Sequence, residues 1–192
     1  MDAGQYLGEY GRSFGTRLDA LLLGRQNRLG RASPGLVPAH KALRARLLAS
    51  PDRRLGALCV IAFEAAGGKA SDALDASLGV ELVASPDDPA LPGLVRAYGL
   101  SSLASGMLAP ERELAAVRLA SDALEEAAWG APRARIFQMA AEVGATLGGL
   151  ADASALGAYA RAVLLGVNTP PPDALGERAA LFEAVARFDV AG

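Results

Sequence analysis

The sequence is poor in aromatic residues, cysteine and histidine. Aromatic side chains make up 5% of its 192 residues, and Cys59 and His40 are the single cysteine and the single histidine. This composition excludes a disulfide framework and gives no metal-ligand spacing. Cys59 stands in an apolar run, which favours a buried and inert thiol. His40 has no serine, cysteine or acid at a suitable spacing, so we expect it at the surface or at a helix cap.

Long apolar runs and targeting signals are also scarce. The longest strongly apolar run, from Leu55 to Ala66, is too short to span a bilayer. The first residues include Asp2 and Glu9, and no basic start followed by an apolar core is visible, so we expect no signal peptide. A soluble, cytoplasmic protein is the expectation that follows.

Alanine and leucine dominate the 52% of hydrophobic residues, and runs of β-branched residues are nearly absent. Small and straight-chain residues lose little rotamer freedom in a helix, so this composition predicts an all-α fold. A chain of 192 residues suits one domain with a substantial core.

Charge is unevenly distributed along the chain. Residues 1–60 contain ten Arg/Lys and four Asp/Glu, a difference of +6, whereas residues 61–192 contain nine and seventeen, a difference of -8. Two differently solvated faces would explain this division, and a basic N-terminal part that faces an anion or an acidic partner is the alternative. Aromatic residues are not interleaved with the basic ones, so nucleic acid is not an expected partner.

Glycine, proline and capping residues divide the chain into about eight apolar helices, which predicts an antiparallel bundle. Ser50-Pro51-Asp52 predicts a helix start, and Gly67-Gly68 predicts the end of that helix. We expect one domain in three parts. These are an N-terminal part over residues 1–35, made of a helix (3–23) and a basic loop (24–35), a core over 36–166, and a C-terminal turn and helix over 167–192.

Adjacent carboxylates and an arginine follow the helix that ends at Ser85-Pro86. Asp87 and Asp88 lie one short helix before Arg96. Neighbouring carboxylates suit Mg²⁺, because a hard cation prefers oxygen ligands and commonly bridges to a diphosphate. The alternative is that Asp88 only caps the next helix.

For three other residues, the sequence predicts a particular environment in the fold. Glu64 and Glu81 lie in otherwise apolar helices, so each should lie at the solvent edge or pair with an arginine, because an unpaired buried carboxylate is costly. Trp129, at a helix end, is expected to anchor the core or an interface.

The order of these segments resembles the trans-isoprenyl diphosphate synthase (polyprenyl synthetase) family. The matching stretches are SPDRRLGAL (50–58), AFEAAGG (62–68), VEL (80–82), DDPAL (87–91) with Arg96, FQMAAEVGATLGG (137–149) and LGAYARAVLL (156–165). The resemblance covers roughly residues 36–166, with deletions, and implies a shortened isoprenoid-synthase-like core.

The chain departs from the family pattern at its chemical positions. Leu91 stands in place of the third aspartate, and Ala97 in place of the second arginine. Pro132-Arg133 occupies the lysine-threonine site, and Leu164-Leu165 occupies the second aspartate pair. Ionising an allylic diphosphate needs positive charge on the departing group, which two carboxylate clusters with Mg²⁺ supply in the family. Half of that cage is missing here.

The resemblance therefore implies a non-catalytic relative that binds an isoprenoid or its diphosphate, or that acts as partner subunit of a prenyl synthase. Arg53, Arg54 and Arg96 would contact the diphosphate. Phe63, Leu78 and Leu82 would flank the chain. Asp87 and Asp88 would form a residual, weak Mg²⁺ site, with no other cofactor. The alternatives are a short-chain Mg²⁺-dependent prenyltransferase with an incomplete cage, and an α-helical interaction protein without a small-molecule ligand.

Assembly is the last expectation. A bundle without the family's C-terminal helices should expose apolar surface where those helices pack, and such patches usually mark an interface. We expect a homodimer, or a heterodimer with a prenyl synthase, that buries at least about 1,000 Å².

Overall fold

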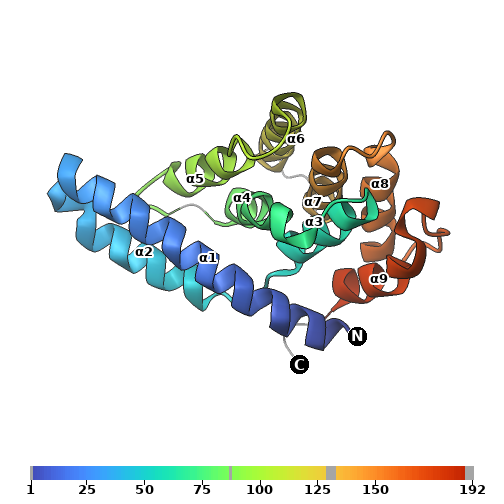
Figure 1. Ribbon diagram of the computed structural model, residues 1–192. Helices are drawn as coiled ribbons and strands as arrows, with labels where there is room; N and C mark the ends of the chain where they lie inside the picture. Colours follow the sequence, from blue (N-terminus) through green and yellow to red (C-terminus); the bar gives the residue numbers. More distant parts are fainter. Residues whose placement is uncertain (1, 87, 129–132, 189–192) are drawn as a thin grey trace.

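The computed structural model of the protein describes residues 2–86, 88–128 and 133–188 (Figure 1). Within these residues the chain forms nine α-helices and three short 3₁₀ helices, and its only extended pairing is an isolated bridge between Asp88 and Leu91. The prediction of an all-α helical bundle is confirmed. No helix in the described part of the chain is both long enough and apolar enough to cross a membrane.

The predicted start at Ser50-Pro51-Asp52 and the predicted end at Gly67-Gly68 lie on either side of one observed helix, Arg54–Ala65. The helices are α1 (Ala3–Ala32), α2 (Val37–Ala49), α3 (Arg54–Ala65), α4 (Leu74–Ala84), α5 (Leu94–Leu103), α6 (Pro110–Ala128), α7 (Arg133–Gly148), α8 (Ala153–Leu164) and α9 (Ala179–Arg187). Gly67 follows α3 with a φ of 91°, and Gly149 follows α7 with a φ of 86°. Glycine adopts this left-handed conformation without a steric penalty, which is why both helices end there.

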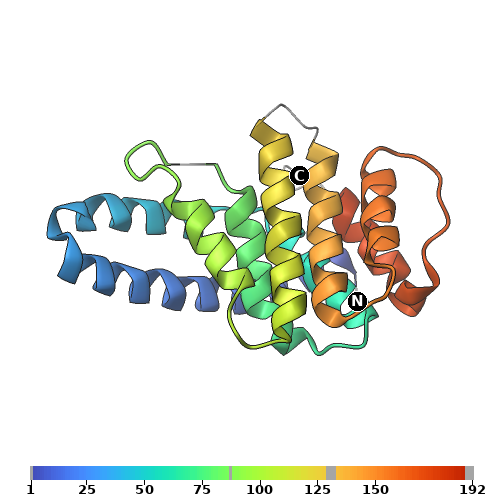
Figure 2. The same cartoon turned by 90° about the horizontal axis from the view of Figure 1, so that it is seen from above.

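Helix α3 lies at the centre of the bundle and packs against α7 and α4 (Figure 1). Every residue of α3 from Gly56 to Phe63 is buried, as its continuous apolar sequence predicts. The approach of α3 and α7 depends on Gly144, because a methyl group there would overlap the backbone carbonyl oxygen of Cys59. Helices α5 and α6 flank this centre on one side, and α8 and α9 flank it on the other (Figures 1 and 2).

The prediction of a loop over residues 24–35 is wrong for most of its length, because α1 continues as one 30-residue helix to Ala32. Residues 24–32 carry no complete apolar stripe, yet arginine, glutamine and leucine all have good helix propensity. The second half of α1 packs antiparallel to α2, and the two form a hairpin that projects from the bundle (Figures 1 and 2). Leu22 and Leu43 are fully buried in this packing.

The predictions for the single cysteine and the single histidine have different outcomes. Cys59 is fully buried as predicted, and burial raises the pKa of its thiol to about 12. The prediction for His40 is wrong, because its side chain is also fully buried and its Nε2 lies 3.1 Å from the hydroxyl of Tyr98. Tyr98 is 58 positions away, so the residues next to His40 carried no sign of this contact. Trp129 lies outside the described residues.

Candidate functional site

A pocket of about 270 Å³ opens where α3 begins, α4 ends and α7 begins, and we call it the α3–α4–α7 pocket. The residues that line it are Ser50, Asp52, Leu55, Glu81, Ala84, Ser85, Pro86, Arg133, Ile136 and Phe137. The turn before α3 and the proline after α4 bring three separate segments of the chain to this one place. It combines ionisable groups with an apolar wall, which is typical of ligand sites.

Asp52 and Arg133, which line the pocket, form a charged group with Arg54 beside it. The carboxylate of Asp52 accepts hydrogen bonds from Nε and Nη2 of Arg54, at 2.9 and 2.7 Å, and from Nη2 of Arg133, at 3.2 Å. Burial alone would raise the pKa of Asp52, but the hydrogen bonds from Arg54 and the charges of both arginines outweigh burial and lower it. Asp52 is therefore an ionised anchor for both guanidinium groups.

Phe137 presents its ring to the same two arginines. The guanidinium carbons of Arg54 and Arg133 each lie 5.5 Å from the ring centroid, which is within the range of a cation–π contact. The side chain of Arg54 is only 10% exposed, and its Nη1 donates to the carbonyl oxygen of Phe188 at 2.6 Å. The side chain of Arg133 is 65% exposed, so Arg133 is the guanidinium that a ligand can reach.

Glu81 lines the pocket from α4 and is buried, with 7% of its surface exposed. Its Oε1 accepts a hydrogen bond of 2.8 Å from the backbone amide of Gly56. Burial raises the pKa of Glu81 to about 7, and the hydrogen bond from Gly56 and the charge of Arg53 offset burial only in part. The carboxyl group can therefore gain or lose a proton near neutral pH, as functional carboxyl groups commonly do.

The contact between Glu81 and α3 requires a glycine at position 56. A side chain there would overlap the hydroxyl of Tyr10, and its Cβ would lie only 3.0 Å from Cγ of Glu81 and 3.1 Å from the carbonyl oxygen of Ser77. The sequence prediction allowed two positions for Glu81, the solvent edge or an arginine pair. The structure gives it neither, since its carboxyl group is buried and accepts from a backbone amide. Glu64 is half-buried at the end of α3.

The three arginines predicted to bind diphosphate do not converge on one point. Arg53 lies over the ring of Phe14, at 4.7 Å from the centroid, and its Nη2 donates to the carbonyl oxygen of Leu47 at 2.5 Å. Arg54 is held by Asp52, as described above. Arg96 is exposed on α5. Of the three, only Arg54 contributes to the charged group beside the pocket.

The residues predicted to flank an isoprenoid chain belong to the core. Phe63, Leu78 and Leu82 are 4%, 1% and 2% exposed, and none of them lines the α3–α4–α7 pocket. The apolar wall of that pocket comes instead from Leu55, Ile136 and Phe137.

The predicted Mg²⁺ pair is described for one of its two members. Asp87 lies outside the described residues. Asp88 forms an ion pair with Arg46 of α2 at 3.0 Å, and its Oδ1 accepts a hydrogen bond of 2.9 Å from the amide of Ala90. Both carboxylate oxygens of Asp88 therefore have protein partners. Across residues 2–86, 88–128 and 133–188, no group of three or more histidine, cysteine or acidic side chains is arranged to hold a metal ion.

Sequence reasoning missed Arg133, Phe137 and Asp52 as site residues. Arg133 stands at the position that the resemblance assigned to the lysine-threonine motif, and Asp52 precedes the arginines of the first motif. Their positions in those motifs were a usable signal. The protonation of Glu81 was not predictable, because it depends on burial between α3 and α4.

In the comparisons with known proteins, no family model matches the sequence and no curated protein matches it. The resemblance to the polyprenyl synthetase family therefore stays a prediction.

Proposed function

We propose that the protein binds a short isoprenyl diphosphate in the α3–α4–α7 pocket and does not turn it over. The observation that carries this proposal is the pairing of one accessible guanidinium, Arg133, with an apolar wall formed by Leu55, Ile136 and Phe137. Such a surface suits an anionic head with a short apolar tail. Its volume of about 270 Å³ lies near the lower end of common ligand pockets, which favours a short chain.

The charges of the pocket are compatible with an anion. Asp52 is already paired with Arg54 and Arg133, so its negative charge is compensated. Because the pKa of Glu81 is raised to about 7, this carboxyl is about half protonated at neutral pH, and the neutral form can donate a hydrogen bond to a phosphate oxygen. The ionised form would repel an anion, so affinity should rise as the pH falls through about 7.

The absence of turnover is part of the proposal. Ionisation of an allylic diphosphate needs metal ions around the departing group. Asp88 is engaged by Arg46, and Leu164 packs against the hydrophobic core where the family pattern has its second aspartate pair. An active short-chain prenyltransferase remains the enzymatic alternative. It predicts Mg²⁺-dependent elongation that disappears in an Asp87→Asn/Asp88→Asn variant.

Calorimetric titration with geranyl and farnesyl diphosphate, with and without Mg²⁺, tests the binding proposal. Geraniol and inorganic pyrophosphate separate the contributions of the tail and the head. Arg133→Ala should weaken diphosphate binding about tenfold to a hundredfold, because a hydrogen bond to a charged group contributes about 1.5–3 kcal/mol. The matched control is Arg118→Ala, since Arg118 is 84% exposed on α6. Equal affinity for both variants, or no heat with either diphosphate, would reject the proposal.

A partner subunit is the second candidate function, and exposed apolar side chains favour it. Met107 and Leu114, near the start of α6, are 68% and 71% exposed. Both could be covered in a homodimer or in a heterodimer with a prenyl synthase. Light scattering over a series of concentrations should show association that a Leu114→Asp variant abolishes. A monomer at every concentration, with no synthase recovered in pull-downs, would exclude this candidate.

A further inference from the structure

The projecting hairpin carries a concentration of positive charge at its tip, which we define as residues 23–41. This segment contains four Arg/Lys residues and no Asp/Glu, a charge of +4 in a protein whose net charge is -2. It comprises the last turns of α1, the 3₁₀ turn Pro34–Leu36 and the first turns of α2. Figures 1 and 2 show that the tip lies at the end of the hairpin that points away from the bundle.

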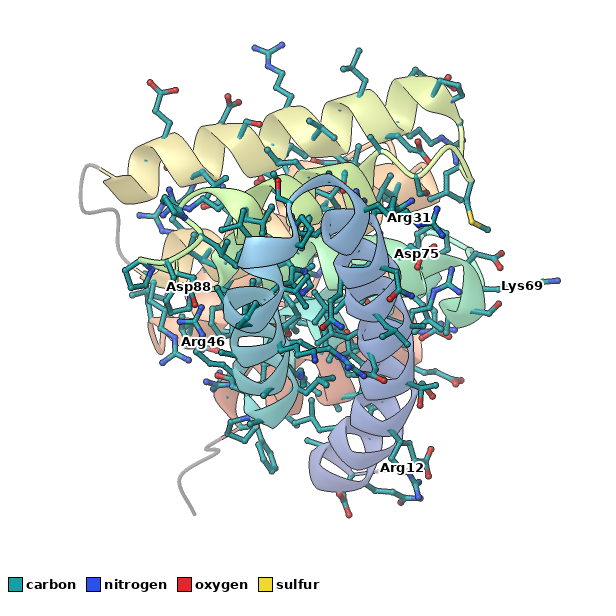
Figure 3. The ribbon with its side chains drawn as sticks, turned by 90° about the vertical axis from the view of Figure 1, so that its left-hand side faces the viewer. Arg12, Arg31, Arg46, Lys69, Asp75 and Asp88 are labelled. Atoms are coloured by element: carbon teal, nitrogen blue, oxygen red, sulfur yellow. The ribbon has the colours of Figure 1, made fainter. Side chains whose placement is uncertain are left out.

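Two of the cations nearer the bundle have acidic partners. Arg17 pairs with Asp75 of α4 at 2.7 Å, and Arg46 pairs with Asp88 at 3.0 Å. Figure 3 shows Asp75 and Asp88 on opposite sides of the hairpin, with Arg46 beside Asp88. These two ion pairs connect the hairpin to the bundle, and they neutralise the charges of Arg17 and Arg46.

Cations at the tip are different. Arg28, Arg31 and Lys41 are exposed, and none of them forms an ion pair with another residue of the described chain. Three positive charges that form no ion pair within the described chain are available to a partner outside the molecule.

Exposed leucines stand among these charges. Leu23 is 41% exposed and Leu36 is 43% exposed. Leu23 and Arg31 are eight positions apart on α1, so they lie on one row of side chains spaced four residues apart along the helix. Leu36 is in the turn itself. The tip therefore presents apolar and basic side chains together.

A nucleic acid is a poor match for this surface. Between Phe14 and Phe63 the sequence contains no phenylalanine, tyrosine or tryptophan, so the tip has no aromatic ring on which a base could stack. Exposed leucines would also gain nothing from contact with a phosphate backbone.

A second copy of the chain is a poor match as well. Helix α6 is the acidic helix of the bundle, but Asp122 already pairs with Arg118 at 3.9 Å, and Glu126 pairs with Arg135 at 2.7 Å. Two of its four exposed acidic residues thus have a partner within the same molecule.

We propose that the hairpin tip docks on the surface of an anionic phospholipid bilayer. Arg28, Arg31 and Lys41 would lie among the lipid phosphates, and Leu23 and Leu36 would enter the boundary between headgroups and acyl chains. Basic residues close to an anionic leaflet strengthen binding about fivefold each. Leucines buried at the same depth add an apolar contribution.

Vesicle flotation tests this proposal with the full chain. Vesicles of phosphatidylcholine alone should not bind the protein, whereas vesicles that also contain phosphatidylserine should bind it, and more weakly at high salt. Arg28→Ala/Arg31→Ala should reduce the partition coefficient about 25-fold. The matched control, Arg118→Ala/Arg161→Ala, removes the same charge from exposed positions on α6 and α8 and should bind like the wild type. Circular dichroism checks that each variant keeps its helix content.

A second variant, Leu23→Gln/Leu36→Gln, separates lipid from other polyanions. It should weaken vesicle binding and leave binding to a DNA duplex at the same salt unchanged. The proposal is overturned if anionic vesicles fail to bind at low salt, or if both arginine double variants lose binding equally. It is also overturned if the wild-type protein binds the DNA duplex more tightly than the anionic vesicles.

Discussion

Replacing Glu81 by glutamine should stabilise the protein at alkaline pH and leave its stability nearly unchanged at acidic pH. The folded state holds the pKa of this buried carboxyl at about 7, against 4.5 in an unfolded chain. Below pH 4.5 the group is protonated in both states, so it adds no pH dependence. Between pH 4.5 and 7 the unfolded chain ionises while the folded protein keeps its proton, and the free energy of unfolding falls as the pH rises.

The size of the effect follows from the difference between these two pKa values. A tenfold change in an acid dissociation constant corresponds to about 1.4 kcal/mol. Raising the pKa of Glu81 from 4.5 to about 7 thus costs the folded protein about 3 kcal/mol above pH 7. Glutamine keeps a carbonyl oxygen that can accept from the amide of Gly56, but it cannot ionise. At about pH 8 we therefore expect Glu81→Gln to be more stable than the wild type by up to about 3 kcal/mol.

Urea unfolding of both proteins at several values between about pH 4.5 and 9 measures this difference directly. Other titrating groups contribute equally to the two proteins, so the difference between their unfolding free energies isolates Glu81. Glu125→Gln, at an exposed position on α6, controls for the loss of one charge. A difference between Glu81→Gln and the wild type that does not change with pH would refute the reasoning about burial.

One further prediction concerns the packing of α7 against α3, and another concerns the titration of the buried His40. Gly144→Ala should lower the melting temperature by about 4–8 °C in a thermal scan, because the added methyl group forces α7 away from the carbonyl of Cys59 at a net cost of about 2 kcal/mol. Gly8→Ala, where the space is open, should instead raise it by up to about 4 °C, and equal shifts for both would contradict this account. Burial, followed by the charge of Arg44, lowers the pKa of His40, so His40 should reduce the stability that Glu81 adds as the pH drops below about 6.5. Between about pH 8 and about pH 5, His40→Phe should therefore gain more stability than the wild type in urea unfolding, and an equal gain would exclude this role of His40.

Local signals in the sequence were sufficient for the fold class and for the ends of α3 and α4. Proline after α4 and glycines after α3 and α7 act through the backbone of one or two residues, so their effect does not depend on tertiary contacts. The extent of α1 was missed because its last turns are stabilised by α2, which packs beside them after the chain has reversed. The spacing of apolar residues within 24–32 does not indicate that contact.

The candidate site was predictable only in part, for the same reason. Asp52 and Arg54 are two positions apart and bind each other, so sequence proximity indicated their region correctly. Arg133 reaches Asp52 from 81 positions away, and Glu81 reaches Gly56 from 25 positions away. Whether a carboxyl group ionises or a guanidinium is exposed is decided by these long-range contacts.

The continuity of α1 has a consequence for how the molecule moves. A helix of 30 residues extends roughly 45 Å without a break, and Arg44 of α2 braces it through Asp19 at 2.6 Å. Hairpin and bundle should therefore rotate in solution as one rigid body. A fluorophore attached near residue 27 would report the slow tumbling of the entire protein, and its anisotropy would decay without a fast component from the arm.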